Sequence, residues 1–145
     1  MTTLSPTTQV CILILPESSM MSLSSLIDPL RAANRLARQH VFSWKLVSLS
    51  GKAIELTCGI KIDVDAALQA DETGDVFMLI AGFNQDEHAP KQSLGRIRKA
   101  SSGFKRIFAV EAATWVLARA GIVNNHRVTT HWEDLENFAF AYPQL

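Results

Sequence analysis

The chain has 145 residues, of which 48% are hydrophobic and 19% are charged, and its 14 basic side chains balance 14 acidic ones. This length and composition predict one packed globular domain and argue against a disordered chain. The neutral charge balance argues against the broad basic surface typical of nucleic-acid-binding domains.

The segment 1–9 is polar and predicts a disordered tail without the basic and apolar regions of a signal peptide. The apolar runs are too short to cross a membrane, so we expect a cytoplasmic protein that makes no membrane contact. The two cysteines, Cys11 and Cys58, lie in apolar runs and predict free buried thiols.

Three short apolar runs predict strands buried on both faces, at residues 10–15, 76–80 and 107–110. Between and around them we expect a helix over 23–37, a strand over 42–49, a hairpin from 54–56 and 60–64, a short helix or turn at 66–70, a polar loop over 84–90, and helices over 91–101, 112–120 and 133–141. Strands that alternate with helices in this way predict an α/β fold, a doubly wound and mostly parallel sheet with helices on both faces.

The first helix contains the pair Asp28-Pro29, which allows two interpretations. Either Asp28 caps a second helical segment with Pro29 in its first turn, or the helix continues and kinks at the proline.

The carboxyl ends of the three buried strands are the expected place for a functional site, because they converge on one crevice in such a sheet. Glu17 follows the first strand, Gly82 and Phe83 follow the second, and Glu111 follows the third. A short strand ending at His131 could bring that imidazole back to Glu111, and the two would then form an acid–base pair.

Glu111 also has a simpler interpretation, because a carboxylate at the start of the helix 112–120 is stabilised by the helix dipole without any function. Spacing alone leaves both interpretations open. The sequence carries no dinucleotide-binding or phosphate-loop motif and no metal-ligand spacing, so we expect no cofactor and no metal. His40, His88 and His126 stand singly in polar context and predict surface residues.

The segment 109–132, AVEAATWVLARAGIVNNHRVTTHW, resembles the nucleophile-elbow region of the DJ-1/PfpI superfamily in the form carried by AraC-type transcriptional regulators. The segment 28–36, DPLRAANRL, resembles the first-helix motif of the same regulators, and the similarity covers residues 10–145. The resemblance implies a flavodoxin-like three-layer sandwich. It also implies that Ala81-Gly82 stands at the family's glycine-rich turn, which offers backbone N–H groups to an oxyanion.

The chain departs from the family pattern at the elbow itself. Glu111 stands at the position of the family's cysteine nucleophile, and Ala109 and Ala113 replace the flanking glycines. A carboxylate cannot supply thiolate chemistry, so the hydrolase, deglycase and protease activities of the superfamily are not expected here. The residues expected to bind a ligand instead are Glu111, His131, Glu17, Gly82, Phe83, Ala112 and Trp132.

The resemblance implies a ligand-sensing and dimerisation domain of an AraC-type regulator. Its effector would be a small molecule, such as an amine or an amino acid, and its functional form a homodimer. DNA would be bound only through a C-terminal helix-turn-helix domain, and we expect residues 10–145 to lack both that domain and the last elements of their own fold. Two alternatives remain: a residual hydrolase- or isomerase-like enzyme that uses Glu111 and His131, and a purely structural dimerisation domain.

Overall fold

A computed structural model describes residues 6–124 and 126–145. Its main sheet has five parallel strands in the order β5-β2-β1-β6-β7, which confirms the predicted doubly wound fold. The strands are β1 (Thr8–Ile14), β2 (Phe42–Ser48), β5 (Ala66–Ala67), β6 (Gly74–Ala81) and β7 (Phe104–Glu111), and the separate antiparallel hairpin pairs β3 (Ile54–Glu55) with β4 (Lys61–Ile62). The helices are α1 (Met20–Ala37), α2 (Gln85–His88), α3 (Lys91–Ser101), α4 (Ala113–Arg119) and α5 (Leu135–Ala141), with a 3-10 turn over Trp132–Asp134.

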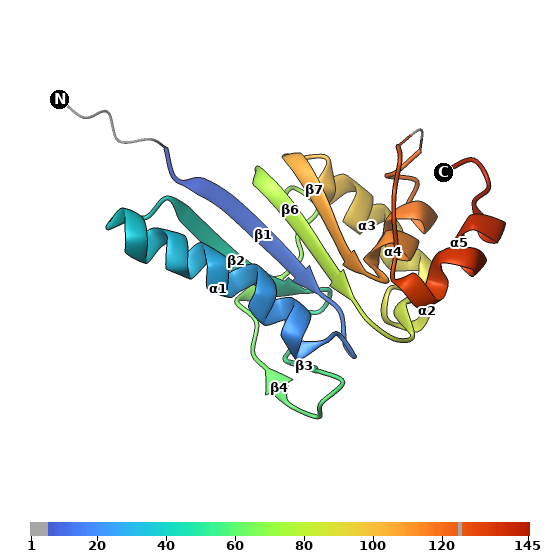
Figure 1. The fold of residues 1–145 in the computed structure, drawn as a ribbon, viewed down its shortest axis with the longest axis horizontal. Coiled ribbons are helices and arrows are strands. Elements are labelled where there is room, and N and C mark those ends of the chain that lie inside the picture. The colour runs from blue at the N-terminus through green and yellow to red at the C-terminus, as the bar shows by residue number, and fades with distance from the viewer. Residues whose placement is uncertain (1–5, 125) are drawn as a thin grey trace.

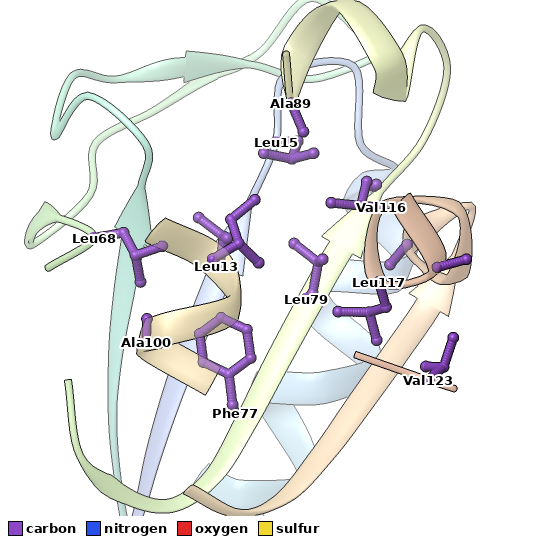
Figure 2. Close-up of a cluster of buried hydrophobic side chains, with 14 of the residues drawn as sticks. Leu13, Leu15, Leu68, Phe77, Leu79, Ala89, Ala100, Val116, Leu117 and Val123 are labelled. Atoms are coloured by element: carbon purple, nitrogen blue, oxygen red, sulfur yellow. The ribbon is translucent and has the colours of Figure 1, made fainter. Parts of the chain in front are cut away.

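Helices cover both faces of the sheet, with α1 on one side and α3 and α4 on the other (Figure 1). Alternate residues of β1 point to opposite faces, as the two-residue period of a strand requires. Ile12 and Ile14 therefore join the core beneath α1, whereas Leu13 and Leu15 join the core beneath α3 and α4. The second core packs Leu13, Phe77 and Leu79 of the sheet against Val116 and Leu117 of α4 (Figure 2).

Helix α1 is continuous through Pro29, so Asp28 does not start a second segment. Ser19 is the N-cap residue, and its hydroxyl accepts a hydrogen bond from the Ser22 N–H. Asp28 instead forms an ion pair with Arg31 one turn along the exposed face, at 2.8 Å. The helix ends at Ala37, and its C-cap residue Arg38 has a left-handed backbone (φ 52°) and donates its N–H to the Arg35 carbonyl at 3.3 Å.

Four local predictions need correction. Residues 66 and 67 form the short edge strand β5 rather than a helix or turn, and the predicted loop over 84–90 contains α2. The short strand expected before His131 is absent from the described residues 126–131, which run without regular structure, and Asn125 lies outside the described residues. The tail predicted over 1–9 gives way to strand at Thr8, while residues 1–5 lie outside the described part.

The prediction that residues 107–110 are buried on both faces is wrong. β7 is the edge strand of the sheet, and the side chains of Ile107 and Phe108 are 37% and 49% exposed. An apolar run shows that a segment favours burial, but it does not show that a neighbouring strand is present.

The prediction of two buried thiols holds for one cysteine only. Cys58 is exposed, at the turn of the β3–β4 hairpin. Cys11 is buried as predicted, and burial raises the pKa of its thiol to about 12.

No helix within the described ranges is both long and apolar enough to cross a membrane.

Candidate functional site

A cavity of about 440 Å³ opens at the carboxyl ends of β1, β6 and β7. Six of the seven predicted site residues line it: Glu17, Gly82, Phe83, Glu111, Ala112 and His131. The seventh, Trp132, lies outside the lining and is 73% exposed. The aromatic wall is formed instead by Trp115 of α4, together with Phe83.

Glu111 stands at a sharp turn between β7 and α4. Its φ of 57° lies in the left-handed region, which a non-glycine residue occupies at a cost of about 1–2 kcal/mol. The framework holds this conformation, because the Ala112 N–H donates to the Ala81 carbonyl at 3.0 Å and the Thr130 hydroxyl donates to the Glu111 carbonyl at 3.4 Å. The turn aims the carboxylate towards α1, where the Ser22 hydroxyl donates a hydrogen bond to it.

Glu17, after β1, has the same unusual backbone, with φ also 57°. Its carboxylate accepts hydrogen bonds from Asn84 Nδ2 at 2.7 Å and from His88 Nε2 at 2.8 Å. These two partners, His88 first, hold the pKa of the Glu17 carboxyl below its ordinary value of 4.5. His88 is therefore no simple surface residue: its side chain is 23% exposed, whereas His40 and His126 are exposed as predicted.

Gly82 is required by the close approach of two loops. A Cβ atom at this position would lie 2.1 Å from the Glu17 carbonyl oxygen, which is too close for any side chain. Glycine thus allows the loop after β6 to pack against the loop after β1, and this contact places Glu17 and Phe83 on the same cavity.

His131 reaches the cavity because threonine hydroxyls tie its segment to the elbow. Thr114 of α4 donates to the Thr129 carbonyl at 2.6 Å, two residues before the imidazole. His131 Nδ1 then accepts a hydrogen bond from the Glu133 N–H at 3.4 Å. Among the described residues, no hydrogen bond or ion pair joins His131 to Glu111, so the two share a cavity without forming a pair.

The cavity is strongly acidic. Five carboxylates line it, and no lysine or arginine stands among its described lining residues: Glu17, Asp86, Glu111, Glu133 and Asp134. Two of these, Glu17 and Glu111, have hydrogen-bond partners within the chain. The described ranges contain no group of three or more His, Cys, Asp or Glu side chains placed to hold a metal ion.

Sequence reasoning missed Trp115, Asp86, Glu133 and Asp134 as lining residues. Trp115 lies four residues after Glu111, but Glu111 precedes α4 and has a left-handed backbone, so helical spacing does not relate the two side chains. Glu133 and Asp134 directly follow the His131-Trp132 pair. Asp86 had no such signal, because the segment 84–90 was predicted as a loop of unknown direction.

Comparisons with known proteins identify the family that the sequence resembles. The model of the DJ-1/PfpI family matches residues 8–141. The transcriptional regulators CdhR and GbdR of Pseudomonas aeruginosa are 31% and 27% identical over 133 residues, and 92% of this chain is covered in both cases. The match spans only 39% of CdhR and 36% of GbdR.

Solved structures agree on the fold. The crystal structure of an AraC family transcriptional regulator from Pseudomonas putida superposes with a TM-score of 0.78 at 24% identity, covering 96% of this chain and 74% of that one. The parallel sheet, the turn at Glu111 and the family match lead to one conclusion: the chain belongs to the DJ-1/PfpI family.

Proposed function

We propose that this domain is the ligand-sensing part of a transcriptional regulator and that it binds a cationic small molecule, such as an amine or a basic amino acid, in the acidic cavity. The observation that carries the proposal is the cavity itself. It has the volume of a small-molecule site, two aromatic walls and five carboxylates without a lysine or arginine among its described lining residues. Such a lining attracts a cation and repels an anion.

Backbone strain supports the same location. Three of the four non-glycine residues with positive φ among the described residues line this cavity, namely Glu17, Asn84 and Glu111. Strained backbone of this kind clusters at binding and catalytic sites, where the surrounding structure holds it.

Glu111 is the proposed anchor for the cation. One of its oxygens accepts the hydrogen bond from Ser22, and the other is left for a ligand. Phe83 and Trp115 supply ring faces that could add a cation–π contact. Catalysis is not part of the proposal, because Glu111 stands where the family carries its cysteine. The cavity beside Glu111 also favours ligand binding over a purely structural role, because a purely structural domain requires no such space.

The regulatory role rests on the relatives. CdhR and GbdR are transcriptional regulators of the helix-turn-helix type, and they extend well beyond the matched part. We propose that DNA contact belongs to a helix-turn-helix segment of a longer polypeptide, that the protein acts as a homodimer, and that it works in the cytoplasm.

The test is a thermal-shift screen of the full chain against amines and basic amino acids, with carboxylic acids as the negative set. A cationic hit should raise the melting temperature, and Glu111→Gln should weaken its binding about 10- to 100-fold, because a hydrogen bond to a charged group contributes about 1.5–3 kcal/mol. Glu136→Gln, which removes an exposed carboxylate of α5 outside the cavity, is the matched control and should leave affinity unchanged. A screen without cationic hits, or a Glu111→Gln variant with unaltered affinity, would contradict the proposal.

A further inference from the structure

A second cavity, of about 350 Å³, lies where the carboxyl ends of β1 and β2 meet the first two turns of α3. Its volume falls within the range of small-molecule sites. The loop after β1 borders both cavities, because Leu15 and Pro16 line the second one whereas Glu17 lines the acidic one.

The charge of the second cavity is opposite to that of the acidic cavity. Its described lining residues include Arg96 and His88 but no aspartate or glutamate. Arg96, on the second turn of α3, is half-buried and forms no ion pair with any described residue. A guanidinium is always charged and carries five N–H donors, so Arg96 is available to bind an anion.

The apolar part of the second cavity comes from the ends of the strands. Leu15 and Ile54 are buried side chains of its lining, and Leu49 is half-buried beside them. Apolar surface of this kind binds the hydrocarbon part of a ligand, because the contact removes both surfaces from water.

Two serines of the lining are buried, and both already have hydrogen-bond partners. The Ser48 hydroxyl donates to the Lys52 carbonyl at 2.9 Å, and the Ser93 hydroxyl donates to the Pro90 carbonyl at 2.8 Å. Neither hydroxyl therefore needs a ligand to satisfy it, and recognition of charge in this cavity depends on Arg96.

His88 connects the two cavities. It lines the second cavity, while its Nε2 lies 2.8 Å from the Glu17 carboxylate of the acidic cavity. A carboxylate with a hydrogen-bond partner repels an anion less than a carboxylate without one, so the charge of Glu17 does not exclude an anion from the second cavity.

We propose that the second cavity binds a small organic carboxylate, with the carboxylate on the Arg96 guanidinium and the hydrocarbon part against Leu15, Leu49 and Ile54. Arginine and carboxylate match in charge and in planar shape, which allows two parallel N–H to oxygen hydrogen bonds. The domain would then have two ligand sites of opposite charge preference.

This inference does not rest on the cation site proposed above, and the two can fail separately. A carboxylic acid that raises the melting temperature should lose this effect in Arg96→Gln, whereas the effect of a cationic hit should persist in the same variant.

The first test measures the binding of straight-chain carboxylates to the full chain by isothermal titration calorimetry. Affinity should rise about fourfold for each methylene added from acetate to pentanoate, because each one is buried against the apolar lining. Pentanamide, which has the same shape without the charge, should bind at least tenfold more weakly than pentanoate. Inorganic phosphate, an anion without a hydrocarbon part, should bind no better than acetate.

Arg96→Gln should weaken pentanoate binding about 10- to 100-fold, since it replaces a charged donor with a neutral one. Arg98→Gln is the matched control and should bind as the wild type does, because Arg98 is an exposed residue of α3 outside the second cavity. The proposal is overturned if no carboxylate binds saturably, if Arg96→Gln binds pentanoate as tightly as the wild type, or if the amide or phosphate binds as tightly as pentanoate.

The second test locates the ligand through the histidine ring signals in nuclear magnetic resonance spectra. Saturating pentanoate should shift the signals of His88, which the His88→Gln variant identifies by their loss. The signals of His131, which lines the acidic cavity, should stay in place. A shift at His131 without one at His88 would place the carboxylate in the acidic cavity and would overturn the proposal.

Discussion

Gly82 shows how one residue without a side chain determines the shape of the cavity. Its Cα lies so close to the Glu17 carbonyl that the loops after β1 and β6 are in direct backbone contact. The pairing of Glu17 with Asn84 and His88 depends on that approach, because these partners lie just beyond Gly82 in the chain.

We expect Gly82→Ala to destabilise the protein by about 1–3 kcal/mol, the usual result of forcing an extra carbon into a packed site. Urea denaturation measures this change directly. Gly95→Ala is the matched control: Gly95 lies within α3 with no atom within 4 Å of an added Cβ, so alanine should stabilise the protein by up to about 1 kcal/mol. Equal effects of the two substitutions would show that the close approach at Gly82 is absent.

At the scale of single elements, α5 is held by aromatic packing on α4. Phe138 is 6% exposed, and its ring contacts that of Trp115 edge to face with centroids 5.0 Å apart. Trp115 also lines the cavity, so α5 supports one of its aromatic walls from behind.

Phe138→Ala should therefore loosen α5 and lower the free energy of unfolding by about 3 kcal/mol, as expected for a buried phenylalanine replaced by alanine. Hydrogen exchange should also become faster over residues 135–141. Phe140→Ala, on the exposed side of the same helix, should change stability by no more than about 0.5 kcal/mol. If both variants unfold alike, α5 does not pack as described.

The elements also show which parts of the fold can be predicted from sequence. The strands at 10–15 and 76–80 could be predicted because a short, continuous apolar run is typical of a strand buried on both faces. The four-residue helix α2 is not, since it is shorter than the period needed to recognise a helix. The exposure of β7 follows from its place at the edge of the sheet formed by the described residues, which no pattern within β7 encodes.

The candidate site also contains features that could be predicted from the sequence and features that could not. Glu17, Gly82 and Glu111 could be predicted because strand ends converge in a parallel sheet, a rule of topology. The hydrogen bond between Glu17 and His88 could not, since it joins the loop after β1 to the end of α2, 71 residues further along the chain. Trp132, predicted as a ligand-binding residue, begins the 3-10 turn and lies outside the cavity lining, because the direction of its side chain does not follow from sequence spacing.

At the scale of the whole molecule, β1 lies in the middle of the sheet and contributes residues to both cores. Trp44 packs against the core beneath α1, and Trp115 packs against the core beneath α3 and α4. Because both cores share one strand, neither can be lost while the other stays intact.

In each of two variants that retain a single tryptophan, Trp44 or Trp115, fluorescence and circular dichroism should therefore give the same urea midpoint. Trp132, which is largely exposed, is replaced by Phe in both variants. Midpoints that differ between the two probes would show that the cores unfold independently.

The turn at Glu111 has a consequence for how such a domain can change over generations. Its left-handed backbone is held by contacts that the Ala81 and Glu111 carbonyls accept, and none of them involves the side chain at position 111. The fold therefore presents whatever residue occurs there to the cavity, and a lineage can exchange a nucleophile for a charge at one position without rebuilding its scaffold.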